Sequence, residues 1–163
     1  MADAALGEVA GYHNDVVSAL ELYFSFGRRP GEIAPELAAH LEETNRRSSF
    51  AVLTRLERAF RVDYEYRCRK RLKDDLSKAF CRMYKEKKTR VRLSEDIFEA
   101  WKEKGRQNRA LRELVAGMRT ALKFRHWIAH GGHWVRPTGK HDFNSIYLLA
   151  ENVLNVFPLR EPD

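Results

Sequence analysis

Apolar residues recur along this chain with the periodicity of helices and not with that of strands. No segment shows the two-residue alternation, bounded by turn residues, that marks a half-buried strand. Glycine, proline and helix-capping residues divide the 163 residues into helical stretches instead. We therefore expect an all-α protein, a single bundle of about five to six helices.

The first half of the chain predicts two long helices. One runs from about Leu6 to Phe26 and ends in the Gly27–Gly31 segment, which is rich in helix breakers. The next begins near Pro35, because proline suits the first helical position, and its periodicity continues to about Lys88. A run of this length should bend or split, and the candidate points are Asn45–Ser49 and the pair Asp74 and Asp75.

The second half predicts three shorter helices with clear capping signals. Ser94 can cap a helix that ends at Gly105. Asn108 can cap the next, which reaches His130 before two glycines stop it, and Asp142 can cap the last. No internal repeat or low-complexity linker separates these helices, so we expect one domain over residues 1–163.

Composition disfavours several classes of function. Cys68 and Cys81 are the only cysteines, and neither belongs to a CxxC pair, so both are interpreted as packing or surface thiols. The six histidines show no HExxH spacing, which predicts no metal and no cofactor. No stretch approaches the roughly 20 apolar residues of a membrane span, and no signal peptide is recognisable, so a cytoplasmic protein is expected.

The net charge of +7 is concentrated in one part of the chain. Residues 46–92 hold 17 Lys and Arg against 6 Asp and Glu, a balance of +11, so the remainder sums to −4. Concentrated positive charge attracts polyanions such as nucleic acid. A solvated helix face that keeps the protein soluble explains the same charge equally well, so both interpretations stay open.

An arginine breaks the amphipathic pattern of the helix predicted over residues 108–130. On a helical wheel with Met118 at zero, Arg125 falls about 20° from the centre of the apolar stripe. A charge in that place requires a carboxylate, a bound anion or a water-filled cleft. The apolar residues within about 60° of Met118 are Leu111, Leu114, Val115, Ala121, Leu122 and Ala129.

Glu57 is the expected partner of Arg125. It lies about 40° from Leu53 on the wheel of the preceding long helix, again on the apolar side. A buried Glu57–Arg125 salt bridge that only fixes helix register is one interpretation. The other is that Glu57 holds Arg125 so that its remaining donors face a phosphate, which suits the planar guanidinium.

His130 lies about 140° round an ideal helix from Arg125. The two side chains can therefore act on one substrate only if the helix unwinds at Gly131, or if two subunits face each other across a cleft. This geometry predicts a homodimer.

Residues 123–131, with the sequence KFRHWIAHG, resemble the signature of the HEPN superfamily: an arginine, usually followed by a polar residue, and a histidine after four to six intervening residues. Two other pairs have this spacing, Arg119 with His126 and Arg136 with His141. The Arg125–His130 pair is distinguished by its place on the apolar stripe, before a helix end and a final amphipathic helix. The chain departs from the family signature at two positions. His126 stands where asparagine is common in the family, and Gly132 stands where one toxin branch has tyrosine.

The resemblance implies a metal-independent endoribonuclease that works as a dimer with a composite active site, in a bacterial toxin–antitoxin or antiviral defence system. The ribose 2′-hydroxyl would attack the adjacent phosphate, with His130 as general base or acid and Arg125 stabilising the phosphate charge. His126 would be the second proton-transfer group or a positioning donor, and Glu57 would support Arg125. The expected RNA contacts are Lys123, Arg119, His133 and Trp134.

Two other functions fit the same sequence. One is a non-catalytic helical module that binds nucleic acid or a partner protein through its basic region, with Arg125 purely structural. The other is a scaffold that senses a small phosphorylated ligand.

Overall fold

The computed structural model describes residues 2–26, 30–139 and 141–161, and within these ranges the chain forms helices and connecting turns without any strand. The expected all-α bundle of about five to six helices is confirmed. The α-helices are α1 (Ala2–Ser25), α2 (Pro30–Lys70), α3 (Asp75–Lys87), α4 (Phe98–Lys104), α5 (Arg109–Ala129) and α6 (Phe143–Val156). A 3₁₀ turn, Lys88–Arg90, and a π-helical turn, Leu93–Ile97, connect α3 to α4.

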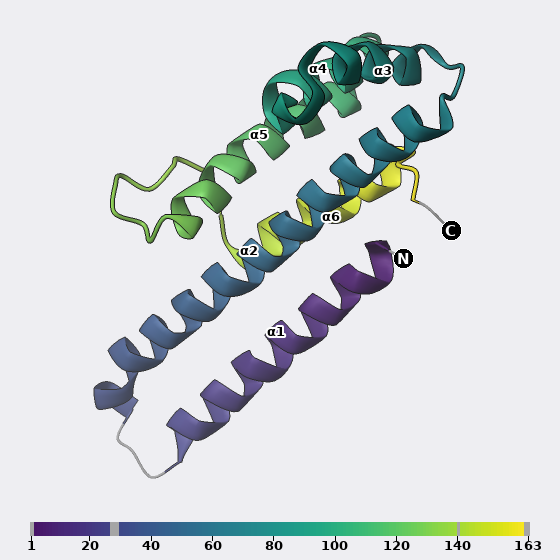
Figure 1. The fold of residues 1–163 in the computed structure, drawn as a ribbon. Coiled ribbons are helices and arrows are strands. Elements are labelled where there is room, and N and C mark those ends of the chain that lie inside the picture. Colours follow the sequence, from purple (N-terminus) through teal and green to yellow (C-terminus); the bar gives the residue numbers. More distant parts are fainter. Residues whose placement is uncertain (1, 27–29, 140, 162–163) are drawn as a thin grey trace.

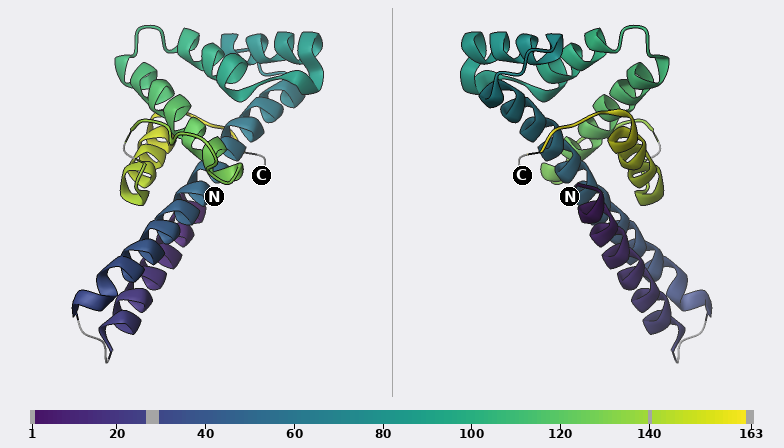
Figure 2. Two further views of the ribbon diagram at one scale, coloured as in Figure 1. Left: turned by 90° about the vertical axis from the view of Figure 1, so that its left-hand side faces the viewer. Right: turned by 90° about the vertical axis from the view of Figure 1, so that its right-hand side faces the viewer.

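The long helix α2 is the scaffold against which the other elements pack (Figure 1). Helix α1 lies along α2 as a hairpin, and both views in Figure 2 show this hairpin projecting away from the other helices. Helices α3, α5 and α6 also contact α2, whereas α4 packs on α3 and α5.

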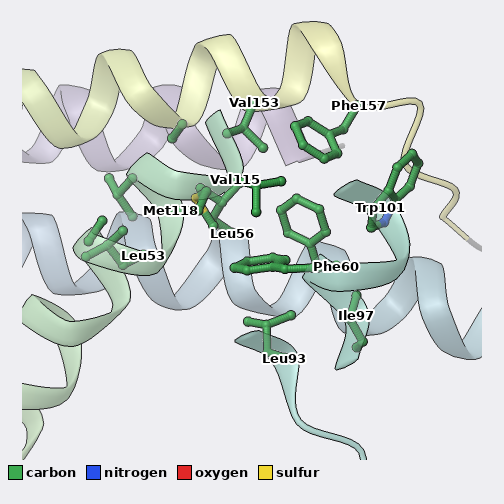
Figure 3. Close-up of a cluster of buried hydrophobic side chains, with 14 of the residues drawn as sticks. Leu53, Leu56, Phe60, Leu93, Ile97, Trp101, Val115, Met118, Val153 and Phe157 are labelled. Carbon is green, nitrogen blue, oxygen red and sulfur yellow. The ribbon is translucent and has the colours of Figure 1, made fainter. Parts of the chain in front are cut away.

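One hydrophobic core joins all six α-helices. Phe60 of α2 lies at its centre, beside Phe157 at a ring distance of 5.2 Å (Figure 3). The ring of Phe98 lies 5.0 Å from Phe60, and both contacts have edge-to-face geometry. Burying each side chain of this size contributes about 1.5–3 kcal/mol to folding. The other core residues labelled in Figure 3 are Leu53, Leu56, Leu93, Ile97, Trp101, Val115, Met118 and Val153.

A buried ion pair joins three distant segments. Arg67 of α2 has a side chain only 2% exposed, and its Nε donates to Oδ1 of the fully buried Asp63 at 2.7 Å. The same guanidinium contacts Asp74 and Ser77 at the start of α3 and donates to the carbonyl of Pro158 at 3.0 Å. Burial raises the pKa of Asp63, although the hydrogen bond from Arg67 opposes this shift.

Local capping signals are largely confirmed. The carboxylate of Asp74 accepts from the Ser77 amide, so the long run does split at the expected acidic pair. Asn108 and Asp142 cap α5 and α6 as expected, accepting from the amides of Leu111 and Ser145. Gly105 ends α4, and Gly131 and Gly132 follow α5 with φ of +75° and +67°, a left-handed conformation that favours glycine.

Two boundary predictions are wrong. Helix α2 continues through Asn45–Ser49, because Ser48 is buried and hydrogen-bonds His13 of α1 at 3.0 Å instead of breaking the helix. Ser94 caps no helix; it lies inside the π-helical turn, where the Asp96 carboxylate accepts from the Arg92 amide at 2.8 Å.

Two further boundaries differ or fall outside the structure. Helix α2 already begins at Pro30, so Pro35 lies within it and is not its first residue. The breaker expected at Gly27–Gly31 lies partly outside the described residues. Within the described part of the chain, no helix combines the length and the hydropathy that crossing a membrane requires.

Replacing Arg67 with alanine should destabilise the fold by about 3–5 kcal/mol, because the substitution leaves a buried carboxylate without its partner. Urea denaturation of the variant measures this loss. The control is Arg47→Ala, which removes a pair whose arginine is 79% exposed and should cost less than about 1 kcal/mol. Equal stability losses in the two variants would contradict a structural role for Arg67.

Candidate functional site

The buried face of α5 turns around the helix axis along its length. From Val115 to Trp127 every third residue is buried, and steps of three rotate the buried direction by about 60° each. The fixed wheel centred on Met118 is therefore wrong at the C-terminal end, where Ala129 is exposed. Arg125 consequently lies at the edge of the packed face, with 29% of its side chain exposed.

A groove of about 1050 Å³ runs between α2 and α5, bordered by residues 91–95 and by the loop after α5. Five cations line it, more than its three carboxylates, so its walls favour an anionic ligand. The cations are Arg61, Arg92, Arg119, Lys123 and Arg125, and the acids are Glu57, Glu95 and Glu99. His126 and Trp134 also line the groove.

Arg125 is held loosely in the groove wall. Its Nη2 lies 3.5 Å from Glu57 Oε2, so the expected partner is present, and its guanidinium carbon lies 5.3 Å from the ring centroid of Phe50. Its Nε is buried without a hydrogen-bond partner among the described residues. Glu57 is shared, since its other oxygen accepts from Arg61 at 3.1 Å. Most of the donor capacity of Arg125 is left for a ligand.

Two histidines and a tryptophan form a cluster at one end of the groove. The rings of His126 and His130 lie 4.2 Å apart, and Trp134 lies 6.0 Å from the first and 5.7 Å from the second. His130 is the C-cap of α5, one turn beyond His126, so the two rings share a face of the helix. His126 and Arg125 both line the groove, whereas His130 does not.

The loop that carries Trp134 is fixed by buried contacts. The indole of Trp127 donates to the Trp134 carbonyl at 2.7 Å. His141 stacks on Phe124 at a ring distance of 4.5 Å, and the Arg136 guanidinium lies 5.3 Å from the centroid of the same ring. Arg136 also forms an ion pair with Glu42 at 3.5 Å. Trp134 is therefore presented to solvent, 49% exposed, on a backbone that is pinned in place.

The sequence did not indicate this pinning role. In the sequence, Arg136 and His141 stand out only as one of the two further pairs with the motif spacing. The signal that could have found them is the aromatic content of the end of α5, since Phe124 and Trp127 need covering side chains from the loop.

The three remaining predicted RNA contacts, Lys123, Arg119 and His133, differ in where they lie and in what they contact. Lys123 is exposed and lines the groove. Arg119 already bonds the Ser94 carbonyl and Glu99, which lowers the pKa of Glu99 through the hydrogen bond, so it ties α5 to α4. His133 is not part of the groove; it folds over Gly131, where an added Cβ would lie 2.9 Å from its Nε2.

Among the described residues, no three His, Cys, Asp or Glu side chains gather in a way that could hold a metal ion. Comparison with known proteins finds no matching family model, no similar curated protein and no similar solved structure. The resemblance of residues 123–131 to the HEPN signature therefore stays a prediction.

Two buried histidines, His141 in the loop after α5 and His13 of α1, should make the stability of the fold depend on pH. Burial lowers the pKa of His141, and also of His13, which stacks on Phe143 of α6 at 3.8 Å. The unfolded chain then binds protons that the folded chain does not, so stability should fall as the pH drops below about 6.5. Thermal melting between about pH 7.5 and pH 5 measures the loss, which should shrink in His141→Leu. A melting temperature that rises toward pH 5 would contradict this assignment.

Proposed function

We propose that this protein is a metal-independent endoribonuclease that cleaves RNA by attack of a ribose 2′-hydroxyl on the adjacent phosphate. The observation that carries the proposal is the loosely held Arg125 in a cation-lined groove, beside two histidines 4.2 Å apart. The single contact of Arg125 with Glu57, at 3.5 Å, leaves donors on its terminal nitrogens for a phosphate in the groove.

Arg125 binds the scissile phosphate in this mechanism. A guanidinium presents its N–H donors in one plane and pairs with two phosphate oxygens at once. As the 2′-oxygen attacks, negative charge grows on those oxygens, and a fixed cation at that position stabilises the transition state. Glu57 keeps the guanidinium oriented from the opposite side.

The two histidines move the protons. One imidazole removes the proton from the 2′-hydroxyl, and the other protonates the departing 5′-oxygen as its bond to phosphorus breaks. The products are a 2′,3′-cyclic phosphate and a free 5′-hydroxyl. His126 is the group nearer the phosphate because it lines the groove, and His130 is its partner. Lys123 contributes a phosphate contact and Trp134 a base contact.

The proposal includes a homodimer with a composite site, because Arg125 and His130 diverge on one helix. It also includes a cytoplasmic role in a bacterial toxin–antitoxin or antiviral defence system, with an antitoxin or another defence protein as partner. These parts follow from the resemblance of the motif.

A non-catalytic module that binds nucleic acid or a protein is the competing function. The contacts of Arg125 with Glu57 and Phe50 favour it, since they would suffice for an arginine that only fixes helix register. The two functions predict different stabilities for the same variant.

Arg125→Ala and His130→Ala should each lower the rate of RNA cleavage by at least about 10²-fold in the presence of EDTA. Arg125→Ala should change the free energy of unfolding by less than about 1 kcal/mol, because Glu57 keeps its pair with Arg61. Gel assays on a labelled RNA and urea denaturation measure the two quantities. Unchanged RNA cleavage by both variants, or a requirement for magnesium, would exclude the proposed enzyme. A decrease of about 3–5 kcal/mol in the free energy of unfolding of Arg125→Ala would favour the non-catalytic module.

Mixing the inactive Arg125→Ala and His130→Ala chains tests the composite site. If one subunit supplies the arginine and the other the histidine, mixed dimers hold one intact site and should restore up to about a quarter of the wild-type rate. No recovery after the chains have exchanged would place both groups of each site on one subunit.

A further inference from the structure

The outer face of α3 carries a row of cations. Lys78, Arg82 and Lys85 lie within about 40° of one direction on this helix, and all three are exposed. Leu76 and Phe80 on the other side of the helix are buried in the core. Lys88 and Arg90 continue the row into the 3₁₀ turn. We call the five cations, Lys78, Arg82, Lys85, Lys88 and Arg90, the α3 strip.

The strip leads into the proposed RNA groove. Two residues after Arg90 the chain reaches Arg92, which lines the groove together with Val91. Helix α3 lies at the end of the molecule opposite the C-terminal end of α1 (Figure 1). A strand that leaves the groove past Arg92 would therefore run along α3.

Ion pairs distinguish the strip from most arginines of α2, although in the described part of the chain Arg58, Arg69 and Lys70 of α2 also have no ion pair. On α2 most arginines of this region are neutralised by acids; these are Arg46, Arg47, Arg55, Arg61 and Arg67. In the part of the chain that the structure describes, Arg82, Lys85, Lys88 and Arg90 have no ion pair, and Lys78 has one exposed pair with Asp75. The unpaired positive charge of this region is thus prominent along α3 and the turn that follows.

Lys88 occupies a position that suits glycine. It has φ of +51° and ψ of −117° as the C-cap of α3, a conformation that is strained for a residue with a Cβ. Arg71, just before α3, likewise has φ of +47°. Lys88 follows α3 and Arg71 follows α2, and at both positions the sequence places a cation where glycine would fit the backbone better, which supports a use of the charge other than folding.

We infer that the α3 strip binds the phosphates of the RNA strand on one side of the cleaved nucleotide. The inference rests on the proposed function, because it extends the same groove. Contacts between cations and phosphates carry no sequence preference, so the strip would add affinity for long strands without selecting bases. A short RNA that fills only the groove would not reach it.

The test compares a long and a short single-stranded RNA, of about 30 and about 4 nucleotides, on a variant with Lys85→Gln and Lys88→Gly. Binding is measured by fluorescence anisotropy in a His130→Ala background, and cleavage with the active protein. The Kd for the long RNA should rise at least about fivefold, and the slope of log Kd against log salt should fall by about 1.4, two phosphates at 0.7 each. Binding and cleavage of the short RNA should stay unchanged, and the melting temperature should not fall, since glycine relieves the strain at Lys88.

The control is a variant with Arg46→Gln and Arg47→Gln, which removes two charges from α2 far from α3 in the sequence. Two results would overturn the inference if the short RNA is still cleaved. One is an equal loss of affinity for the long RNA in the control variant, and the other is wild-type affinity for the long RNA in the strip variant. If the wild-type protein neither binds nor cleaves the short RNA, the proposed function fails and the inference falls with it.

Discussion

The ion pair of Arg67 with Asp63 is the interaction on which the arrangement of the helices depends. It occupies the interior near the end of α2, and it reaches both the first turn of α3 and the segment that follows α6. The amide of Arg160 completes it by donating to the same carboxylate at 2.9 Å. Breaking a pair of this kind leaves a buried charge, so these two segments are held in one arrangement relative to α2. The groove between α2 and α5 is built on that frame.

Two arginines of this chain lie against its core, and they differ in how far their donors are satisfied. Arg67 has partners for all its nitrogens and is almost fully buried. Arg125 has one ion-pair contact, at 3.5 Å, and a ring beneath it, so among the described residues the donors of its terminal nitrogens are largely unused. The first arrangement stabilises a fold, and the second is what a ligand-binding arginine requires before its ligand arrives. This difference, and not the burial of charge as such, supports a functional site.

The sequence was informative where the physical signal is local. Asp74, Asn108 and Asp142 cap helices because a short side chain can reach an amide two or three residues on, whatever the rest of the chain does. The meeting of Glu57 and Arg125 could also be predicted, since each is a charge on an apolar stripe.

Features that depend on tertiary packing could not be predicted in this way. A helical wheel assumes one buried direction, but the packed side of α5 turns as different elements cover it, which moved Arg125 to the edge. The charge count over residues 46–92 includes Arg67 without setting it apart, because only the assembled core brings Asp74 and Pro158 to it. The approach of Trp134 to His126 and His130 depends on a loop pinned by Trp127.

The central claim is that this groove promotes attack by a ribose 2′-hydroxyl, and the products of a chimeric strand test it most directly. In a DNA oligonucleotide with one ribonucleotide, only that residue carries the attacking hydroxyl. Mass spectrometry should find a single cut on its 3′ side, leaving a 2′,3′-cyclic phosphate and a 5′-hydroxyl. Cleavage at the deoxynucleotides, or a product with a 5′-phosphate, would contradict the account.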